Sequence, residues 1–475
     1  MDTKKLRQKI LDLAIHGKLV PQDPNDEPAS VLLERIRAEK EQLIKEGKIK
    51  APKKGKSAAD TSHYPKEGPW ELPEGWAIAS VQEVFQINPK NSSNEDADAG
   101  FVPMANISDG FSDCFTFEIR PWKTIKSGFT HFADNDVAVA KISPCLENRK
   151  SFVAKELPNG IGAGTTELFV FRSSQIVPEY TLLFFKSDYF ISSCVGTFNG
   201  VVGQQRASRN VIEELVFPIP PKSEQYRIVQ KVRTLFDDID VIDNGKNAVE
   251  ESVAMCKAKI LELAIHGKLV PQDASEEPAI ELLKRINPNY TPSHNLHYGE
   301  SLPTGWVCAS YGILNQHRNR SINPMDSPNE QYELYSVPIY ETGYPGYLTG
   351  KEIGSTKQAV EKGDVLLCKI NPHLNRAWVV EHYNPKLKCI ASSEWLVFQS
   401  DALCPDYARL FFMSPAFRYL MLSNVSGVGG SLMRARASAV DGYPIWVPPV
   451  NEQKRIVMVV KAYYKVLDDI VAGLH

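Results

Sequence analysis

The eleven residues LAIHGKLVPQD occur twice in this chain, at positions 13–23 and, unaltered, at positions 263–273. The match is longer than this stretch, because residues 9–36 align without gaps with residues 259–286, and most of the differences between them are conservative. An internal repeat of this size constrains the architecture more strongly than any single motif does. The sequence therefore predicts two versions of one module.

The repeat continues along both halves in the same order. LPEGWAIAS (72–80) corresponds to LPTGWVCAS (302–310), and later matches pair 135–149 with 363–376, 165–171 with 392–398, 179–190 with 406–417, and 217–229 with 445–457. Between these matches the two halves have diverged. We infer that the halves share a frame and differ in their interiors.

A long helix is predicted after the PPKSEQ motif. Apolar residues alternate there at spacings of four and three, a seam that packs one helix against another. Lys246 beside Gly245 interrupts the seam, Ser223 is the expected N-cap, and Gly267 is the expected stop. Roughly 42 residues would form a rod of about 60 Å. The seam consists of Ile228, Val232, Leu235, Ile239, Ile242, Val249, Val253, Cys256, Ile260 and Leu263.

The C-terminal segment has the same seam but only a little over half of its length. Leu6, Ile10 and Leu13 supply the missing part at the other end of the chain, which predicts a circularly permuted two-fold repeat. The combined helix is about six residues shorter than the central one, so we expect a gap or kink where its two parts meet. The C-terminal seam consists of Ile456, Val460, Tyr463, Leu467, Ile470 and Leu474.

The composition is that of a globular protein. At 475 residues, with 43% apolar and 23% charged residues, the chain should form two to four domains. The net charge of −3 indicates no bulk affinity for nucleic acid, although a local basic patch is compatible with it. We find no signal-peptide pattern and no run long enough to span a membrane, and we expect a cytoplasmic protein. The eight scattered cysteines include no C-x-x-C pair and favour reduced thiols over a metal site.

In this combination the chain resembles the specificity subunits of type I restriction-modification systems. The resemblance covers nearly the whole chain and rests on LPEGW and LPTGW opening each variable region, on PIPPKSEQYRIV and VPPVNEQKRIV closing them, and on AIHGKLV ending the helical spacers. It implies that each variable region is an α/β target-recognition domain reading one half of a bipartite site in double-stranded DNA. The interiors differ, so we expect an asymmetric site.

The resemblance also implies the partners. The subunit would have no catalysis of its own and would bind no cofactor. It would join two methyltransferase subunits, which methylate adenine N6 with S-adenosylmethionine, and restriction subunits, which cleave DNA using ATP and Mg²⁺. The rod of about 60 Å would span roughly 17 base pairs and would separate the two half-sites.

The expected fold class is α+β, with two recognition domains separated by long antiparallel coiled-coil helices in a pseudo-two-fold, circularly permuted arrangement. The predicted divisions are an N-terminal helix completing the second spacer (1–17), a helix and basic linker (18–64), the first recognition domain (65–221), the central spacer helix (222–267), a short helix and linker (268–300), the second recognition domain (301–449) and the C-terminal spacer helix (450–475).

No catalytic motif emerges from the sequence. Residues 55–57, GKS, lack the earlier glycine of a phosphate-binding loop. SPCL (143–146) and NPHL (371–374) lack the second proline and the aromatic residue of an amino-methyltransferase tetrapeptide, and H-E-x-x-H and G-x-S-x-G are absent. The alternative is a stand-alone DNA-binding or nuclease-like protein with a duplicated site, which would need acidic or nucleophilic clusters repeated in both halves. A third possibility is an adaptor that binds only protein.

Residues matched between the halves should serve the fold or grip phosphate, whereas residues that differ at equivalent places should read bases. By sequence, Lys141 pairs with Lys369 and Arg149 with Arg376, either as phosphate contacts or as ordinary surface charges and structural ion pairs. Arg206 aligns with Arg436 through R-A-S. The DNA-contact candidates are Asn106, Lys141, Arg149, Lys150, Asn199, Gln204, Gln205, Arg206 and Arg209 in the first half, and Arg318, Arg320, Lys369, His373, Asn375, Arg376, Ser431, Arg434 and Arg436 in the second.

The doubled stretch itself offers four candidate docking residues, His16, Lys18, His266 and Lys268. Each histidine precedes a glycine at a predicted helix end, where it can satisfy the last carbonyl groups and suit the helix dipole. Identical residues are unsuited to reading different half-sites. The stretch should therefore either close the frame or present the same surface to two identical methyltransferase subunits.

Overall fold

The structure, a computed structural model, describes residues 2–47, 49, 71–196, 205–292, 301–426 and 433–474. The chain divides into two compact units, Met1–Gly245 (unit 1) and Lys246–His475 (unit 2). Helix α8 (Lys222–Ile265) contributes residues to both units as one helix of 44 residues. Among the described residues, no helix is long and apolar enough to cross a membrane.

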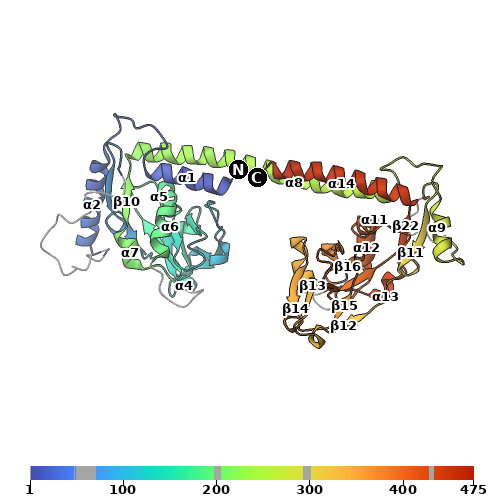
Figure 1. Ribbon diagram of the computed structural model, residues 1–475. Coiled ribbons are helices and arrows are strands. Elements are labelled where there is room, and N and C mark those ends of the chain that lie inside the picture. The colour runs from blue at the N-terminus through green and yellow to red at the C-terminus, as the bar shows by residue number, and fades with distance from the viewer. Residues whose placement is uncertain are drawn as a thin grey trace. The chain divides into compact units, whose positions relative to one another are not determined.

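Unit 1 combines two four-stranded sheets with a two-stranded ladder (Figure 1). In spatial order, the first sheet contains β2 (Gln86–Ile87), β9 (Leu168–Arg172), β6 (Val137–Ala140) and β7 (Ser151–Val153), and the second contains β4 (Glu118–Pro121), β3 (Asp98–Val102), β8 (Ile161–Gly164) and β5 (Thr130–Ala133). The ladder joins β1 (Ala77–Ser80) and β10 (Val216–Ile219). Besides α8, the helices are α1 (Thr3–Ile15), α2 (Ala29–Lys45), α3 (Val81–Val84), α4 (Trp122–Ile125), α5 (Pro178–Phe185), α6 (Asp188–Val195) and α7 (Arg209–Glu214).

Helices α1 and α8 run antiparallel in unit 1. Arg7, near the start of α1, forms ion pairs with Asp240 and Asp243 of α8, whereas the chain just after α1 lies against the start of α8 through Gln22 and Glu224. Apolar residues of both helices share one core with aromatic residues from the strands and shorter helices of unit 1. The N-terminal helix therefore completes a helical pair with the first part of α8 and packs against α5 and α6 of its own unit (Figure 1).

Unit 2 repeats this plan with different sheets. Its strands form a three-stranded sheet of β17 (Ala377–Val379), β16 (Val365–Cys368) and β19 (Trp395–Phe398), and a five-stranded sheet of β12 (Ser321–Ile322), β15 (Lys357–Ala359), β18 (Lys388–Ala391), β13 (Gln331–Tyr335) and β14 (Gly346–Thr349). Two ladders pair β11 (Val307–Ser310) with β22 (Pro444–Val447), and β20 (Val425–Ser426) with β21 (Arg434–Ala435). The helices are α9 (Ala279–Ile286), α10 (Tyr311–Leu314), α11 (Pro405–Phe412), α12 (Pro415–Ser423), α13 (Ala437–Val440) and α14 (Val450–Ala472).

Helix α14 packs antiparallel to the second part of α8. Lys257 of α8 forms an ion pair with Asp468, late in α14, and its carbonyl oxygen accepts a hydrogen bond from the Tyr464 hydroxyl. Two details of the predicted helices are wrong. The central helix begins at Lys222, so Ser223 lies inside the first turn instead of capping it. The seam is also not buried throughout, because Ile242 and Cys256 are exposed.

The doubled stretch forms a sharp joint in unit 1. After α1 ends, Gly17 adopts φ +67°, and the Lys18 N–H donates to the Leu13 carbonyl oxygen, which terminates the helix in a Schellman-type turn. A Cβ atom on Gly17 would lie 2.7 Å from Pro73 Cδ, so the joint packs directly onto the LPEGW motif. The repeated glycine is thus required for both its backbone conformation and its close approach.

A buried carboxylate fastens this joint. Glu224 accepts a hydrogen bond from the Trp76 indole N–H at 3.0 Å and from the Gln22 amide at 3.1 Å. Gln22 also donates to the Gly17 carbonyl oxygen at 2.8 Å. The GKLVPQ, LPEGW and PPKSEQ motifs, far apart in sequence, therefore meet at one side chain.

Unit 2 contains the same joint with the same geometry. Glu452 accepts from the Trp306 indole N–H at 3.0 Å and from the Gln272 amide at 3.1 Å. Gly267 adopts φ +64°, and a Cβ atom there would lie 2.5 Å from Pro303 Cγ. The three repeated motifs therefore contact one another in one structural joint, which occurs once in each unit.

Replacing Gly17 with alanine should destabilise unit 1 by about 2–4 kcal/mol, because the left-handed backbone and the clash with Pro73 both oppose a Cβ atom. Gly47→Ala is the matched control, since Gly47 has φ +69° but nothing within 4 Å of an added Cβ, and it should cost about 1 kcal/mol. Urea unfolding measures both variants. Equal losses would show that the packing against Pro73 contributes nothing.

Candidate nucleic-acid interface

Three separate segments meet where β6 ends in unit 1. The Lys141 N–H donates to the Glu167 carbonyl oxygen, and the Ala207 N–H donates to the Lys141 carbonyl oxygen, both at 2.9 Å. A β-bridge between Ile142 and Arg206 aligns the loop after β6 with the segment before α7. We call Lys141, Glu167 and Arg206 the first Lys–Glu–Arg cluster.

The side chains of this cluster form a bidentate ion pair beside a lysine. Arg206 donates from Nε and Nη2 to the two Glu167 carboxylate oxygens at 2.8 and 2.7 Å. These bonds hold the pKa of Glu167 below its usual range. The Lys141 ammonium lies 5.3 Å from the centre of the Phe169 ring, and its burial lowers its pKa although the Glu167 carboxylate opposes this shift. The cluster is therefore a fixed guanidinium beside a partly desolvated ammonium.

Unit 2 contains the equivalent cluster, Lys369, Glu394 and Arg434. The Lys369 N–H donates to the Glu394 carbonyl oxygen, and Arg434 Nη2 donates to Glu394 Oε1 at 2.8 Å. The exposed fractions of the two arginine side chains are nearly equal, 47% for Arg206 and 48% for Arg434. The two glutamates were not among the predicted site residues. Their place in TTE and SSE of the matched segments was the signal that could have revealed them.

The structure corrects the sequence alignment of this region. Arg206 corresponds to Arg434, not to Arg436, because each forms the β-bridge to the isoleucine after the matched lysine. Ala207 and Ala435 likewise both donate to that lysine's carbonyl oxygen. The R-A-S letters had placed the two segments two residues out of register.

Arg149 is a structural residue and not an accessible cation. Its side chain is 8% exposed, forms an ion pair with Asp188, and stacks over the Phe111 ring at 5.0 Å. Its carbonyl oxygen accepts a hydrogen bond from Lys186, whose burial lowers its pKa to about 7. Of the two alternatives for Arg149, this environment favours the structural ion pair over phosphate contact.

Lys150 is also committed to the fold. Its ammonium donates to the carbonyl oxygen of Ile107 at 2.7 Å and to that of Met104 at 3.3 Å, which holds the turn that contains Asn106. Its structural counterpart in unit 2 is Arg376, because the carbonyl oxygens of both residues accept a hydrogen bond from equivalent backbone N–H groups, those of Ala140 and Cys368. Arg376 is half-buried beside Glu341. The predicted match of Arg149 with Arg376 is thus one residue out of register.

Asn375 takes the place that Arg149 has in unit 1. Both residues have a left-handed backbone, with φ +50° and +58°. The Asn375 amide donates to the Met413 carbonyl oxygen at 2.6 Å, so this side chain is also engaged within the fold.

The other predicted residues are spread over the surface. Gln205 lies beside the first cluster, and Arg209 pairs with Glu213 one helical turn away. His373 and Arg436 are exposed near the second cluster. Arg318 and Arg320 are exposed, but Arg320 pairs with Glu361 before β16, whereas Lys369 follows that strand. Asn199, Gln204 and Ser431, together with residues 55–57, lie outside the described residues.

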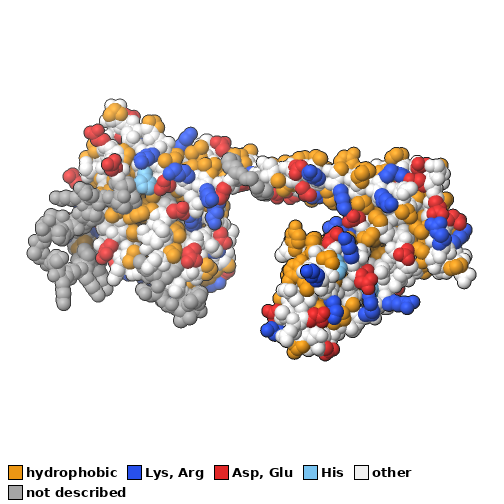
Figure 2. Space-filling model, in the orientation of Figure 1, with side chains coloured by type: hydrophobic (Ala, Val, Ile, Leu, Met, Phe, Trp, Pro, Cys, Tyr) orange, Lys and Arg blue, Asp and Glu red, His pale blue; other side chains and the backbone are white. Residues whose placement is uncertain are grey.

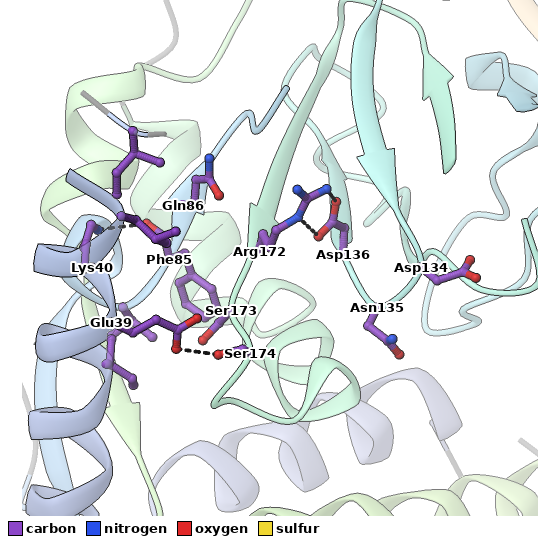
Figure 3. A pocket seen from close by; sticks show the side chains of 14 residues that line it. Glu39, Lys40, Phe85, Gln86, Asp134, Asn135, Asp136, Arg172, Ser173 and Ser174 are labelled. Carbon is purple, nitrogen blue, oxygen red and sulfur yellow. Dashed lines mark hydrogen bonds and ion pairs between the residues drawn. The ribbon is translucent and has the colours of Figure 1, made fainter. Parts of the chain in front are cut away.

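A cleft of about 290 Å³ lies at the opposite end of β6 from the cluster, between α2 and the loops that precede β6 and follow β9. Figure 3 shows Arg172 paired with Asp136, and Glu39 of α2 bonded to Ser174. Lys40 donates to backbone carbonyl oxygens, including that of Phe85, and its burial lowers its pKa. The charged groups that line the cleft have partners within the protein, and the cleft lies away from the predicted DNA-contact residues.

Among the carboxylates repeated in both units, two pairs lie near the ends of β6 and β16, and neither pair was predicted from the sequence. Asp136 pairs with Arg172, whereas its counterpart Asp364 accepts a hydrogen bond from the Glu361 N–H, and burial raises the pKa of Asp364 to about 6. The second pair is Glu167 and Glu394, at the far ends of β6 and β16. Because the two acids of each unit lie at opposite ends of one strand, they do not form a shared metal site. Within the described ranges, no group of three metal-binding side chains is present.

The two histidines of the doubled stretch bond back to their own helices. His16 Nδ1 lies 2.5 Å from the Asp12 carbonyl oxygen, and His266 Nδ1 lies 2.7 Å from that of Glu262. His266 also packs edge-on against Trp446. These contacts agree with a capping role, whereas Lys18 and Lys268 are exposed after the helix ends.

Charge on the visible faces of both units is mixed. Figure 2 shows basic and acidic side chains interspersed over each unit. A mixed surface with a net charge of −3 provides little non-specific attraction for DNA.

Comparison with known proteins identifies the family. A model described as the type I restriction modification DNA specificity domain matches residues 73–251. The specificity subunit of the type I restriction enzyme EcoEI from Escherichia coli is 34% identical across 99% of this chain and 91% of its own length. The chain belongs to the specificity subunits of type I restriction enzymes. The resemblance inferred from the sequence is thus confirmed.

Further relatives of this specificity subunit agree. The EcoAI specificity subunit of Escherichia coli is 44% identical over 60% of this chain and 55% of its own length. A chain solved in work on complex assembly and conformational transition of the type I R-M system aligns with TM-score 0.58 and 17% identity, covering 86% of this chain and 96% of that one. The HsdS subunit from Thermoanaerobacter tengcongensis aligns with TM-score 0.50 and 17% identity, covering 86% of this chain and 93% of that one, so both neighbours support the fold.

Replacing Arg149 with alanine should destabilise unit 1 by about 1–3 kcal/mol, because the substitution removes a buried ion pair and its packing on Phe111. Arg209→Ala is the control, since this exposed i,i+4 pair should be worth less than about 0.5 kcal/mol. Thermal unfolding measures both. An Arg149→Ala chain with normal stability but weakened DNA binding would restore the phosphate-contact prediction.

Proposed function

We propose that this specificity subunit recognises an asymmetric, bipartite site in double-stranded DNA, with each unit reading one half. The observation that carries the proposal is the duplicated Lys–Glu–Arg cluster. A guanidinium and an ammonium occupy the same place in both units, while neighbouring side chains differ. Cations at equivalent positions suit contact with phosphate, which is the same at every base pair. Side chains that differ at equivalent positions suit contact with different bases.

The long helices are proposed to set the unread spacing between the half-sites. Helix α8 is continuous for 44 residues, a length of about 66 Å at the helical rise. Helices α1 and α14 each pack antiparallel to one part of it, which supports the proposed coiled-coil spacer.

The subunit is proposed to act as a scaffold without catalysis. In this proposal two methyltransferase subunits bind S-adenosylmethionine and methylate adenine N6, and restriction subunits bind ATP and Mg²⁺. Two identical partners need two identical surfaces. The repeated joints supply such a pair, with Lys18 and Lys268 exposed at equivalent positions.

Co-expression with the two methyltransferase subunits should methylate a bipartite adenine motif in the host genome. Sequencing that detects N6-methyladenine measures the motif, and omission of this chain should abolish the methylation. A continuous or palindromic motif would contradict the proposal of two different half-sites.

Reversing the charge of both Lys18 and Lys268 to glutamate should prevent binding of two methyltransferase subunits, because the same repulsion is introduced on both docking surfaces. Native mass spectrometry reports the stoichiometry. Lys45→Glu is the control, because Lys45 is exposed on α2 outside the repeated stretch. A normal two-to-one assembly of the double variant would rule out docking through these lysines.

A further inference from the structure

We propose that Glu167 and Glu394 are positioning residues for DNA reading, an inference that rests on the proposed function. Each glutamate would hold its arginine at a fixed place on a DNA phosphate and thereby set the register for the diverged residue before that arginine. These residues are Gln205 in unit 1 and Met433 in unit 2.

An acidic residue beside cations that are proposed to contact DNA is unexpected on electrostatic grounds. A carboxylate near DNA phosphates is repelled by them, so it weakens simple electrostatic binding. Even so, a glutamate lies in the same place in both units and engages the arginine there. Arginine loses considerable side-chain freedom when it is immobilised, and the two-bond ion pair of Arg206 fixes the plane of its guanidinium before DNA arrives. Arg434 is held by its bond to Glu394 Oε1. The glutamate thus weakens the electrostatic attraction to DNA but fixes the position of the arginine side chain.

The glutamates are themselves held rigidly. The Glu167 N–H donates to the Thr165 hydroxyl at 3.2 Å, and the Glu394 N–H donates to the Ser392 hydroxyl at 3.3 Å. Their carbonyl oxygens accept from the matched lysines. The backbone of each glutamate is therefore held at both its N–H and its carbonyl oxygen, as a positioning role requires.

Positive charge remains after this pairing. The Glu167 carboxylate offsets the charge of Arg206, and its lowered pKa keeps it ionised at neutral pH. Lys141 then provides the excess positive charge of the cluster, as Lys369 does in unit 2. A phosphodiester is the anion that this arrangement fits in a DNA-binding protein.

The residues before the arginines differ at the same backbone position. The Gln205 carbonyl oxygen accepts from the Ser143 N–H at 2.8 Å, and the Met433 carbonyl oxygen accepts from the Asn371 N–H at 2.7 Å. Glutamine suits the paired donor and acceptor of adenine, and an apolar side chain suits the thymine methyl group. Two different half-sites require the same phosphate contact in both units, from the arginine, and a different side chain beside it, here Gln205 or Met433.

The test uses the full chain assembled with its methyltransferase subunits. Binding is measured on four duplexes at two salt concentrations: one with the genome-mapped motif intact, one with the first half scrambled, one with the second half scrambled, and one unrelated. The variants are Glu167→Gln, Glu394→Gln, Arg206→Ala and Gln205→Met. Glu213→Gln is the matched control, since it removes the same charge from the neighbouring Arg209 pair.

Glu167→Gln should lower the preference for the intact duplex over the first-half scramble by about tenfold, while binding to unrelated DNA stays equal or tightens by about threefold because a negative charge is lost. Its preference against the second-half scramble should not change. Glu394→Gln should show the reverse pattern. Arg206→Ala should weaken binding to all four duplexes and reduce the salt dependence by about one phosphate contact, and Gln205→Met should change only the first half-site.

Three outcomes would overturn the inference. Unchanged half-site preference in both glutamine variants would exclude positioning. Equal weakening on all four duplexes, together with a lower melting temperature, would indicate a purely structural ion pair. A Glu213→Gln variant with the same selectivity loss would show that any nearby charge suffices. If the wild-type assembly fails to distinguish the intact from the scrambled duplexes, the proposed function itself fails.

Discussion

A buried carboxylate holds together three distant segments in each unit. Glu224 and Glu452 accept the indole N–H of the LPxGW tryptophan and the amide of the GKLVPQ glutamine, and burial raises the pKa of both carboxyl groups. A buried carboxylate without such donors costs several kcal/mol. Each motif is therefore constrained by the other two. This constraint accounts for the repeated glycine and glutamine of the doubled stretch, which both belong to the joint.

The joint fixes where each recognition fold begins and ends. The LPxGW motif starts the first strand of a unit, and the EQ motif follows its last strand, so both ends of the variable region are fastened at one place. The loops that are candidates for DNA contact lie, in chain order, between the first and the last strand of each unit. Their side chains can change without disturbing the frame, because the buried contacts of the joint involve none of them.

The frame was predictable from the sequence, whereas the register of the loops was not. Repeated letters and apolar spacing located the helices, their antiparallel partners and the helix-ending glycines. The alignment failed where few letters match, placing Arg206 opposite Arg436 and Arg149 opposite Arg376. In both places the true match is set by strand pairing, and a shift of one or two residues leaves the letters equally plausible. Only backbone hydrogen bonds distinguish the alternatives.

A basic residue in a recognition domain is not by itself evidence of DNA contact. Arg149 and Lys150 are the clearest examples, because their charged groups bind Asp188 and backbone carbonyl oxygens inside the fold. Arg206 and Arg434 also have acidic partners, but they remain about half exposed and occur at one equivalent place in both units. Burial and duplication together distinguish basic residues that serve the fold from those that are candidates for DNA contact. An arginine that is duplicated, half exposed and held by a duplicated glutamate is better suited to meeting a regular phosphate backbone than one that the protein has already enclosed.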